Sequence, residues 1–345
     1  MISHTTGGEK MDRFLITGGA GFIGSNFIHY LLRKYQDIKI TNLDKLTYAG
    51  NLDNLKDIES DSRYKFVKGD IKDRKVVKEL MKKTDIVVHF AAETHVDRSI
   101  LEAGEFIMTD VYGTYTLLDE AKNSNIKLFI HISTDEVYGS IENGSFKEED
   151  NLMPSSPYSA SKVAGDRLAY SYSKTYDLPV IILRPSNNYG PYQYPEKVIP
   201  FFITKALEHK TLPIYGDGKN VRDWLYVEDC CEAIDLIINK GTAGEVYNLG
   251  ASQEVPNIEM AQRILEILNK PANLIEFVKD RLGHDRRYSL HWDKLKKLGW
   301  QPKFDFKSGL EETVRWYKEN QHWWQKITQK SKEFKKFYQA YYKKR

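Results

Sequence analysis

The stretch Thr17-Gly18-Gly19-Ala20-Gly21-Phe22-Ile23-Gly24 decides how the rest of this chain is interpreted. It follows the apolar run RFLIT (13–17), which predicts a strand. It opens a segment (22–34) with apolar residues spaced by three and four, which predicts a helix. Its glycines fit both G-x-x-G-x-x-G and G-x-G-x-x-G, and such glycines let backbone N–H groups approach a pyrophosphate at the positive end of a helix. The stretch therefore predicts a turn that binds the diphosphate of a dinucleotide.

Short runs rich in Val, Ile and Phe alternate with helical segments along the chain. The predicted strands are 13–17, 38–43, 64–67, 85–90, 127–133, 180–184 and 246–250, and the predicted helices are 22–34, 73–83, 105–123, 158–176 and 227–240. This β-α-β-α order favours a parallel sheet covered by helices on both faces, with ligands bound at the carboxyl ends of its strands. We predict an α/β fold with a Rossmann-like, doubly wound parallel sheet.

Proline and glycine become frequent after residue 190, where the regular alternation ends. We predict a dinucleotide-binding domain from 11–190 plus about 226–250, and a smaller α/β substrate-binding lobe from about 191–225 plus 251–320. The remaining residues, 321–345, form a predicted helical tail. Within it, 332–345 mixes Lys with Phe and Tyr and is typical of an amphipathic packing helix.

Composition excludes several classes of function. The chain has 51 Lys and Arg against 48 Asp and Glu, a formal net charge of +3, so neither nucleic acid nor an anionic membrane is an expected partner. The two cysteines, Cys230 and Cys231, are adjacent, which excludes a disulfide framework and a multi-cysteine zinc site. No metal site is predicted. No run is long and apolar enough for a membrane span and no export signal is evident, so a cytoplasmic location is expected.

Asp44 ends the second predicted strand, at the distance from the glycine turn where a carboxylate accepts hydrogen bonds from an adenosine ribose. Such a carboxylate repels a 2′-phosphate, so the residues favour NAD over NADP. Lys45, directly beside it, is the base that could serve a 2′-phosphate instead.

Tyr158 and Lys162 lie four residues apart and so share one face of the predicted helix 158–176. A free phenol titrates near 10, so it acts as a base only when a cation stabilises the phenolate. The ammonium one turn away and the positive nicotinamide ring of NAD would both do so. The strand 127–133 leads to Ser133 and Thr134 at the sheet edge where this helix is also predicted to begin. The alternative interpretation of Tyr158 and Lys162 is a pair of exposed helix residues without a catalytic role.

The glycine turn and the Tyr158–Lys162 pair are what the extended short-chain dehydrogenase/reductase family carries, and the chain resembles that family over about residues 11–320. Finer matches make it similar to the nucleotide-sugar 4,6-dehydratases, above all to those that act on dTDP-glucose. These matches are LDKLTYAGN (43–51), HFAAETHVDRSI (89–100), STDEVYGS (133–140), SPYSASK (156–162), RPSNNYGPYQYPEKVIP (184–200), RDWLYVED (222–229) and DRLGHDRRY (280–288).

The resemblance implies an NAD-dependent dehydration of dTDP-glucose to dTDP-4-keto-6-deoxyglucose. Tyr158 takes the C4 hydroxyl proton while NAD takes hydride from C4, water is lost across C5 and C6, and the hydride returns to C6. Glu136 is implied as the C5 base and Asp135 as the C6 acid, in a catalytic set completed by Thr134 and Lys162. For Asp135 to donate a proton at neutral pH, burial or its acidic neighbour must raise its pKa.

The resemblance also implies two binding sets and a homodimer formed through helices 105–123 and 158–176. The cofactor set is Gly18, Gly21, Phe22, Ile23, Gly24, Asp44, Lys45, Thr47, Asp70, Ile71, Ala91, Thr109, Tyr158, Lys162 and Asn188. The nucleotide-sugar set is Thr94, Thr134, Asn187, Lys197, Val198, Pro213, Tyr215, Arg222, Asn257, Arg281, His284 and Arg287. The cations of the second set suit a diphosphate.

Several positions depart from the family pattern: Asp110 stands where Asn is usual, Cys230 where His is usual and Thr94 where Ser is usual, and SLHWDK (289–294) and the tail beyond about 325 also differ. The open alternatives are a 4,6-dehydratase of UDP-glucose or UDP-N-acetylglucosamine, a nucleotide-sugar epimerase, and a non-catalytic NAD-binding regulator. The adjacent carboxyl groups of Asp135 and Glu136 favour dehydration, because the related epimerases lack them. An intact Tyr158–Lys162 pair argues against a regulator.

Overall fold

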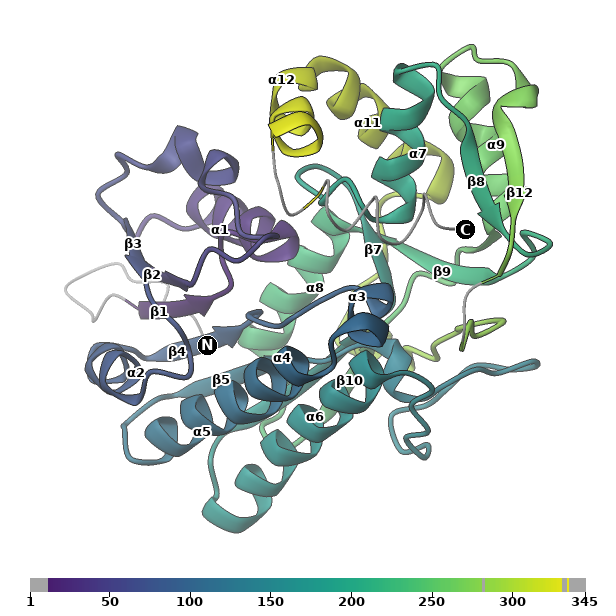
Figure 1. Cartoon of the computed structure of the whole chain (residues 1–345). Helices are drawn as coiled ribbons and strands as arrows, with labels where there is room; N and C mark the ends of the chain where they lie inside the picture. The colour runs from purple at the N-terminus through teal and green to yellow at the C-terminus, as the bar shows by residue number, and fades with distance from the viewer. Residues whose placement is uncertain (1–11, 281–282, 331–333, 335–345) are drawn as a thin grey trace.

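A computed structural model describes residues 12–280, 283–330 and 334 of the chain (Figure 1). In these residues, one parallel sheet of seven strands has the order β10-β6-β5-β4-β1-β2-β3. The strands are β1 (Asp12–Thr17), β2 (Ile38–Asp44), β3 (Tyr64–Lys68), β4 (Ile86–His89), β5 (Leu128–Ile132), β6 (Val180–Pro185) and β10 (Val246–Leu249). Each predicted strand is present, and the predicted fold class is confirmed.

Helices cover both faces of this sheet because side chains alternate along its strands. In β1, Phe14 and Ile16 join a core with α1 (Phe22–Lys34) and α8 (Val227–Lys240). Leu15 joins the opposite core, built with helices that include α5 and α6, which run side by side in Figure 1. The helices of that second face are α2 (Arg74–Met81), α5 (Thr114–Lys122) and α6 (Pro157–Tyr176).

The predicted helix 105–123 is interrupted, which corrects its prediction as one regular helix. It consists of α4 (Gly104–Phe106), a π-helical stretch η2 (Ile107–Gly113) and α5. A π-helix inserts an extra residue per turn and is frequent at functional sites. Here the wider turn carries Asp110, which is buried and hydrogen-bonded to the backbone N–H of Glu93 at 2.8 Å.

The remaining described strands form two small sheets that lie above the main sheet in Figure 1. One has the order β11-β9-β7, and in the other β8 pairs with β12. These strands are β7 (Asn187–Tyr189), β8 (Leu212–Tyr215), β9 (Val221–Tyr226), β11 (Glu254–Pro256) and β12 (Ile275–Val278). They share a core with α7 (Val198–Leu207), α9 (Asn257–Ile267) and α11 (Phe306–Glu319), in which Ile203, Trp224 and Leu310 are buried.

Shorter elements complete the described chain. They are η1 (Leu52–Ile58), α3 (Val96–Leu101), η3 (Asp135–Val137), η4 (Ala272–Leu274), α10 (Asp293–Lys297), α12 (Gln321–Gln325) and η5 (Lys326–Lys330). The predicted helix 332–345 lies outside the described residues except for Phe334, and the domain boundaries stay a prediction. Over the described ranges, no helix combines the length and the apolar character needed to cross a membrane.

Candidate active site

The glycine turn joins the end of β1 to the start of α1. Gly18 has a φ of +71°, and a Cβ there would lie 2.6 Å from the backbone nitrogen of Ala91. A Cβ on Gly24 would lie 2.5 Å from the carbonyl oxygen of Gly18. Gly21 caps α1 with extended backbone and has no side chain to cover the N–H groups of the first turn. The turn thus requires glycine and exposes backbone donors to an anion.

Asp44 lies beside this turn at the end of β2. Its Oδ2 accepts the backbone N–H of Ala20 at 2.9 Å, and its Oδ1 accepts that of Leu46 at 2.8 Å. Burial raises the pKa of Asp44, although these two N–H groups oppose the shift. Each carboxylate oxygen retains a lone pair for a further donor, as a ribose diol requires.

Lys45 forms an ion pair with Asp70, with 2.9 Å between Nζ and Oδ2. Burial opposes ionisation of Asp70, but the backbone N–H of Lys72 and the ammonium of Lys45 lower its pKa. The cation that could have served a 2′-phosphate is therefore already neutralised by a carboxylate. This pairing strengthens the preference for NAD.

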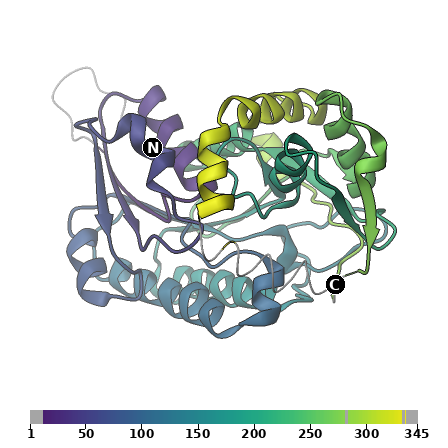
Figure 2. The same cartoon turned by 45° about the horizontal axis from the view of Figure 1, so that its top comes forward.

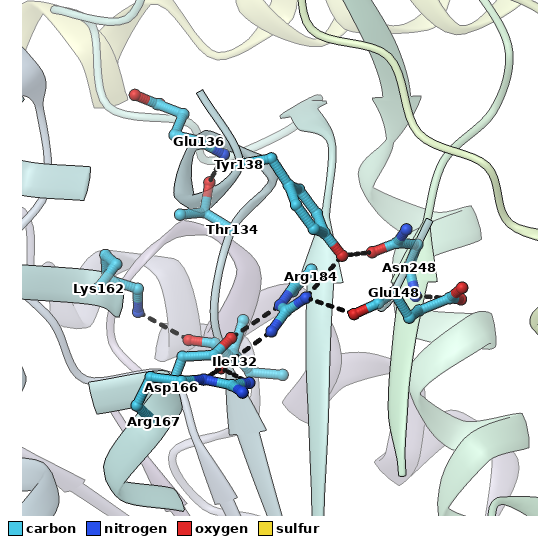
Figure 3. A network of polar contacts seen from close by, with 10 residues as sticks. All are labelled: Ile132, Thr134, Glu136, Tyr138, Glu148, Lys162, Asp166, Arg167, Arg184 and Asn248. Atoms are coloured by element: carbon cyan, nitrogen blue, oxygen red, sulfur yellow. Dashed lines mark hydrogen bonds and ion pairs between the residues drawn. The ribbon is translucent and has the colours of Figure 1, made fainter. Parts of the chain in front are cut away.

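Tyr158 and Lys162 occupy the first turns of α6, which begins as its sequence predicts. Ser156 caps the helix by accepting the backbone N–H of Ser159 at 3.1 Å, and Pro157 holds the first helical position. The Lys162 ammonium is buried and donates to the carbonyl oxygen of Ile132 at 2.7 Å, which ties α6 to the end of β5 (Figure 3).

The protein groups around Tyr158 keep its phenol protonated. Burial is the main cause that raises its pKa well above the ordinary value, and the carboxyl groups of Glu136, Asp110 and Asp135 raise it further. A hydrogen bond with Thr134 opposes the shift. The expected lowering of this pKa therefore needs more positive charge than the protein groups provide.

Asp135 and Glu136 begin the short helix η3, directly after Thr134. Burial and then the charge of Glu136 raise the pKa of Asp135 well above its usual range, which confirms the two causes expected from the sequence. The Thr134 hydroxyl donates to Oδ1 of Asp135 at 3.1 Å, while Oδ2 is buried and lacks a hydrogen-bond partner among the described residues. Asp135 is thus suited to hold a proton at neutral pH.

Two cavities meet at this point. The main cavity, of about 300 Å³, is lined by every residue of the predicted cofactor set and of the predicted catalytic set. The adjoining cavity, of about 160 Å³, is lined by Val198, Pro213, Tyr215, Arg222, Asn257 and His284 of the predicted nucleotide-sugar set. Four residues line both cavities: Glu136, Tyr158, Asn187 and Lys197. Thr94 lines the main cavity, where its hydroxyl lies 3.1 Å from the Lys197 ammonium.

Two predicted residues are not placed at these cavities. Arg281 lies outside the described residues. Arg287 is absent from both linings; its guanidinium instead forms two 2.6 Å contacts with the carboxylate of Glu254 on β11. This pairing joins two segments that are 33 positions apart in sequence, so the motif that contains Arg287 does not reveal it. The role of Arg287 in binding the diphosphate stays a prediction.

Comparison with known proteins identifies the family. The sequence profile of the GDP-mannose 4,6 dehydratase family matches residues 15–313. The chain belongs to the nucleotide-sugar 4,6-dehydratase family. It is 52% identical over 303 residues to the low-salt glycan biosynthesis protein Agl12 of Haloferax volcanii, covering 88% of this chain and 97% of that protein. It is 49% identical to a dTDP-glucose 4,6-dehydratase of Actinoplanes, covering 90% and 99%.

Solved structures agree with this placement in the dehydratase family. The crystal structure of DesIV, a dTDP-glucose 4,6-dehydratase from Streptomyces venezuelae with NAD and TYD bound, superposes with a TM-score of 0.90 at 48% identity. The similarity covers 91% of this chain and 99% of DesIV. The resemblance inferred from the motifs is therefore confirmed.

Glu93 lines the site but is absent from the site residues that the sequence predicted. It lines the main cavity, and burial, followed by the charges of Asp110 and Glu105, raises its pKa to about 7. It lies inside the motif HFAAETHVDRSI, next to Thr94, so the motif contained the signal. Two residues that line the adjoining cavity also lie inside motifs of the family: Trp224 in RDWLYVED and Tyr288 in DRLGHDRRY.

A buried ionic network supports the sheet beneath the site (Figure 3). Arg184 on β6 donates to both carboxylate oxygens of Asp166 on α6, at 2.8 and 3.1 Å. It also donates to the phenol of Tyr138 at 2.7 Å, which in turn donates to Asn248 at 2.8 Å. The network fixes α6, which carries Tyr158 and Lys162, against the strands whose ends form the cavity.

Proposed function

We propose that this chain catalyses the NAD-dependent dehydration of dTDP-glucose to dTDP-4-keto-6-deoxyglucose. The observation that carries this proposal is that Asp135 and Glu136 line the same cavity as the glycine turn and Tyr158. One site thus combines the groups for oxidation with a carboxyl pair for elimination. Relatives named dTDP-glucose 4,6-dehydratase, about half identical over most of the chain, support the same reaction.

The main cavity fits NAD by its own structure. Its glycine turn leaves no room for side chains beside the N-terminus of α1, where the diphosphate would bind. Asp44 would accept the hydroxyl groups of the adenosine ribose, while Asn188, Tyr158 and Lys162 line the part of the cavity expected to hold the nicotinamide. When bound, NAD supplies a hydride acceptor, a positive ring charge and finally a hydride donor.

Tyr158 is the base that takes the proton of the C4 hydroxyl. Burial, followed by the charges of three carboxyl groups, keeps its phenol neutral, so the phenol becomes basic only when a positive charge lies beside it. Lys162 fixes the end of β5 through Ile132 and adds a buried ammonium to the cavity that Tyr158 also lines. Thr134 shares a hydrogen bond with Tyr158 and orients it toward the sugar.

Asp135 and Glu136 divide the elimination between them. Once C4 is a ketone, the C5 proton is acidic, and Glu136, which faces both cavities, removes it. Asp135 is deeply buried with a raised pKa and gives its proton to the leaving C6 hydroxyl. The unequal environments of the two adjacent carboxyl groups support this division into one base and one acid.

The adjoining cavity is suited to the nucleotide diphosphate of the substrate. Arg222 is buried there, with its guanidinium carbon 4.2 Å above the ring of Tyr288. Lys197 stands between the two cavities and supplies a second cation at the sugar end. Asn257, Pro213 and Tyr215 line the far part, where the base is proposed to bind.

The direct test is to incubate the purified protein separately with dTDP-glucose, UDP-glucose and UDP-N-acetylglucosamine and to weigh the products. We expect loss of one water from dTDP-glucose and slower or no reaction with the UDP sugars. A product of unchanged mass would indicate an epimerase. Dehydration of a UDP sugar but not of dTDP-glucose would make that UDP sugar the substrate. Binding of NAD without turnover of any of the three would indicate a regulator.

We also propose that the dehydratase is a homodimer. Apolar side chains are exposed on α3 and η2, namely Leu101, Ile107, Met108 and Tyr112, and Tyr170 is exposed on the neighbouring α6. A second copy of the same helical face is the partner that the family resemblance implies for this surface. Sedimentation should give a dimer, and the double variant Ile107→Asp with Met108→Asp should give a monomer. Phe277→Asp, at an exposed aromatic on β12, should leave the dimer intact.

A cytoplasmic location is proposed as well. Cys230 and Cys231 are both free and buried, as befits a reducing compartment. Fractionation of the source cells with an antibody to this chain tests it, and recovery outside the cytoplasmic fraction would contradict it.

A further inference from the structure

A residue near the C-terminal end of the described chain contacts the segment that follows β2. The indole Nε1–H of Trp323 on α12 donates to Oδ1 of Asn54 on η1 at 2.8 Å, across 269 positions of sequence. Trp323 is 8% exposed and Asn54 is 1% exposed, so water does not compete for this bond. The contact is therefore a buried, specific link between distant parts of the chain.

Asn54 is in turn hydrogen-bonded to the glycine turn. Its Nδ2 donates to the carbonyl oxygen of Ala20 at 3.0 Å, and the backbone N–H of Asn51 donates to the same oxygen at 2.9 Å. Because an indole is only a donor and a carbonyl only an acceptor, the amide of Asn54 has a single orientation that satisfies both neighbours. Trp323 thus fixes the orientation in which Asn54 holds Ala20.

Two further contacts of the same C-terminal segment reach the surroundings of the main cavity. The Lys326 ammonium forms an ion pair with Asp53, the neighbour of Asn54. The buried ring of Phe334 lies 6.2 Å from the ring of Tyr194, which lines the cavity itself. Figure 2 shows this segment, in yellow, standing between the purple N-terminal helices and the green helices of the opposite side.

We propose that Trp323 is a positioning residue for the dinucleotide: through Asn54 it holds Ala20 and hence the glycine turn in the conformation that receives the diphosphate. This inference rests on the proposed binding of NAD at that turn. Ala20 also donates its N–H to Asp44, so the same residue joins the diphosphate-binding and ribose-binding parts of the site. Loosening Ala20 is therefore expected to weaken both contacts with NAD while leaving the adjoining cavity unchanged.

The test compares two neighbouring tryptophans. Trp323→Phe removes the donor to Asn54 but keeps an aromatic ring in the cluster with Trp316 and Tyr192. Trp324→Phe is the matched control, since the indole of Trp324 is also buried but donates to Tyr317 of the neighbouring helix at 2.9 Å. The full-length variants, freed of bound nucleotide, are titrated by calorimetry with NAD and separately with dTDP, and their folding is followed by circular dichroism.

We expect Trp323→Phe to weaken NAD binding about fivefold or more, with dTDP binding unchanged, and Trp324→Phe to change neither. A folded Trp323→Phe variant that binds NAD like the wild type, or loses NAD and dTDP affinity together, overturns the inference. If Trp323→Phe does not fold, Asn54→Asp decides, because the carboxylate still accepts from Trp323 but cannot donate to the Ala20 carbonyl: weaker NAD binding supports the inference, and unchanged binding overturns it. Failure of the wild type to bind NAD would instead contradict the proposed function.

Discussion

Asp110 and Ser161 are joined by a buried hydrogen bond, in which the Ser161 hydroxyl donates to Oδ2 of Asp110 at 2.7 Å. Ser161 lies between Tyr158 and Lys162 on α6, and its hydroxyl is also 2.8 Å from the carbonyl oxygen of Tyr158. The carboxyl group of Asp110 therefore lies against the helix that carries Tyr158 and Lys162. Burial raises its pKa to about 6, although Lys162, Ser161 and the Glu93 N–H oppose the shift.

Asp110→Asn is expected to stabilise the protein at neutral pH. Because the folded-state pKa is above the unfolded one, the folded state holds a proton that the unfolded state loses between about pH 4 and pH 6. The contribution of Asp110 to stability thus falls as pH rises through this window, by roughly 3 kcal/mol in all. The Asn side-chain oxygen still accepts the Glu93 N–H, and its amide nitrogen donates to the Ser161 hydroxyl, which keeps its own hydrogen bond to the Tyr158 carbonyl. The variant therefore pairs the same groups without the charge, and its gain in melting temperature should be larger near neutral pH than near pH 4. An equal difference at both pH values would contradict this.

Glu136→Gln is expected to stop the reaction after the first oxidation. The amide keeps the shape of the side chain but cannot take the C5 proton, so turnover should fall by about 10²- to 10⁴-fold. The absorbance of reduced nicotinamide should appear on mixing with dTDP-glucose and persist. Glu142→Gln, at an exposed position a few residues further along, serves as the control and should react normally. Wild-type turnover of Glu136→Gln would remove Glu136 from the assigned role.

Asp135→Asn is expected to slow the loss of the C6 hydroxyl and to change the pH profile. The raised pKa of Asp135 means that it works as an acid only below that pKa, so wild-type turnover should fall on the alkaline side. Asn retains an acceptor for Thr134 but is not an acid at any working pH. The variant should therefore have lower turnover and a flatter alkaline limb in a plot of kcat against pH. An unchanged alkaline limb would show that a group other than Asp135 causes the alkaline fall.

Arg184→Met is expected to destabilise the fold by about 3–5 kcal/mol, because it leaves the Asp166 carboxylate buried without its main partner. Arg184 is 1% exposed and Asp166 is fully buried. Burial opposes ionisation of Asp166, but Arg184 is the largest cause that lowers its pKa to about 2. The pair therefore stabilises the fold above about pH 4 and is lost as pH falls toward 2. Arg167→Met, which removes a guanidinium that binds the same carboxylate but is 43% exposed, should cost less than about 1 kcal/mol in chemical unfolding. Equal losses for the two variants would contradict this assignment.

The main sheet could be predicted because each of its strands is short, apolar and followed by a recognisable helix or turn. The glycine turn, Asp44, Thr134 and Tyr158 all follow or precede such elements, so their meeting at one sheet edge follows from parallel topology. The assignment of Asp135 as the acid came from the family resemblance, and the structure adds that burial and the charge of Glu136 raise its pKa.

The features that escaped prediction depend on contacts between residues far apart in sequence. The π-helical turn at Asp110 depends on packing against Glu93 and α6, which apolar spacing does not encode. The pairing of Arg287 with Glu254 likewise depends on two segments meeting in space. The bond from Trp323 to Asn54 spans nearly the whole chain, and no local pattern marks either residue.

The central claim is that one cavity removes a hydride from one sugar carbon and returns it to another, with elimination of water in between. The most direct test supplies dTDP-glucose deuterated at C4 in ordinary water and locates the label in the product by mass spectrometry and NMR. We expect a 4-keto-6-deoxy product that carries the deuterium at C6. Dehydrated product without deuterium at C6 would contradict the claim.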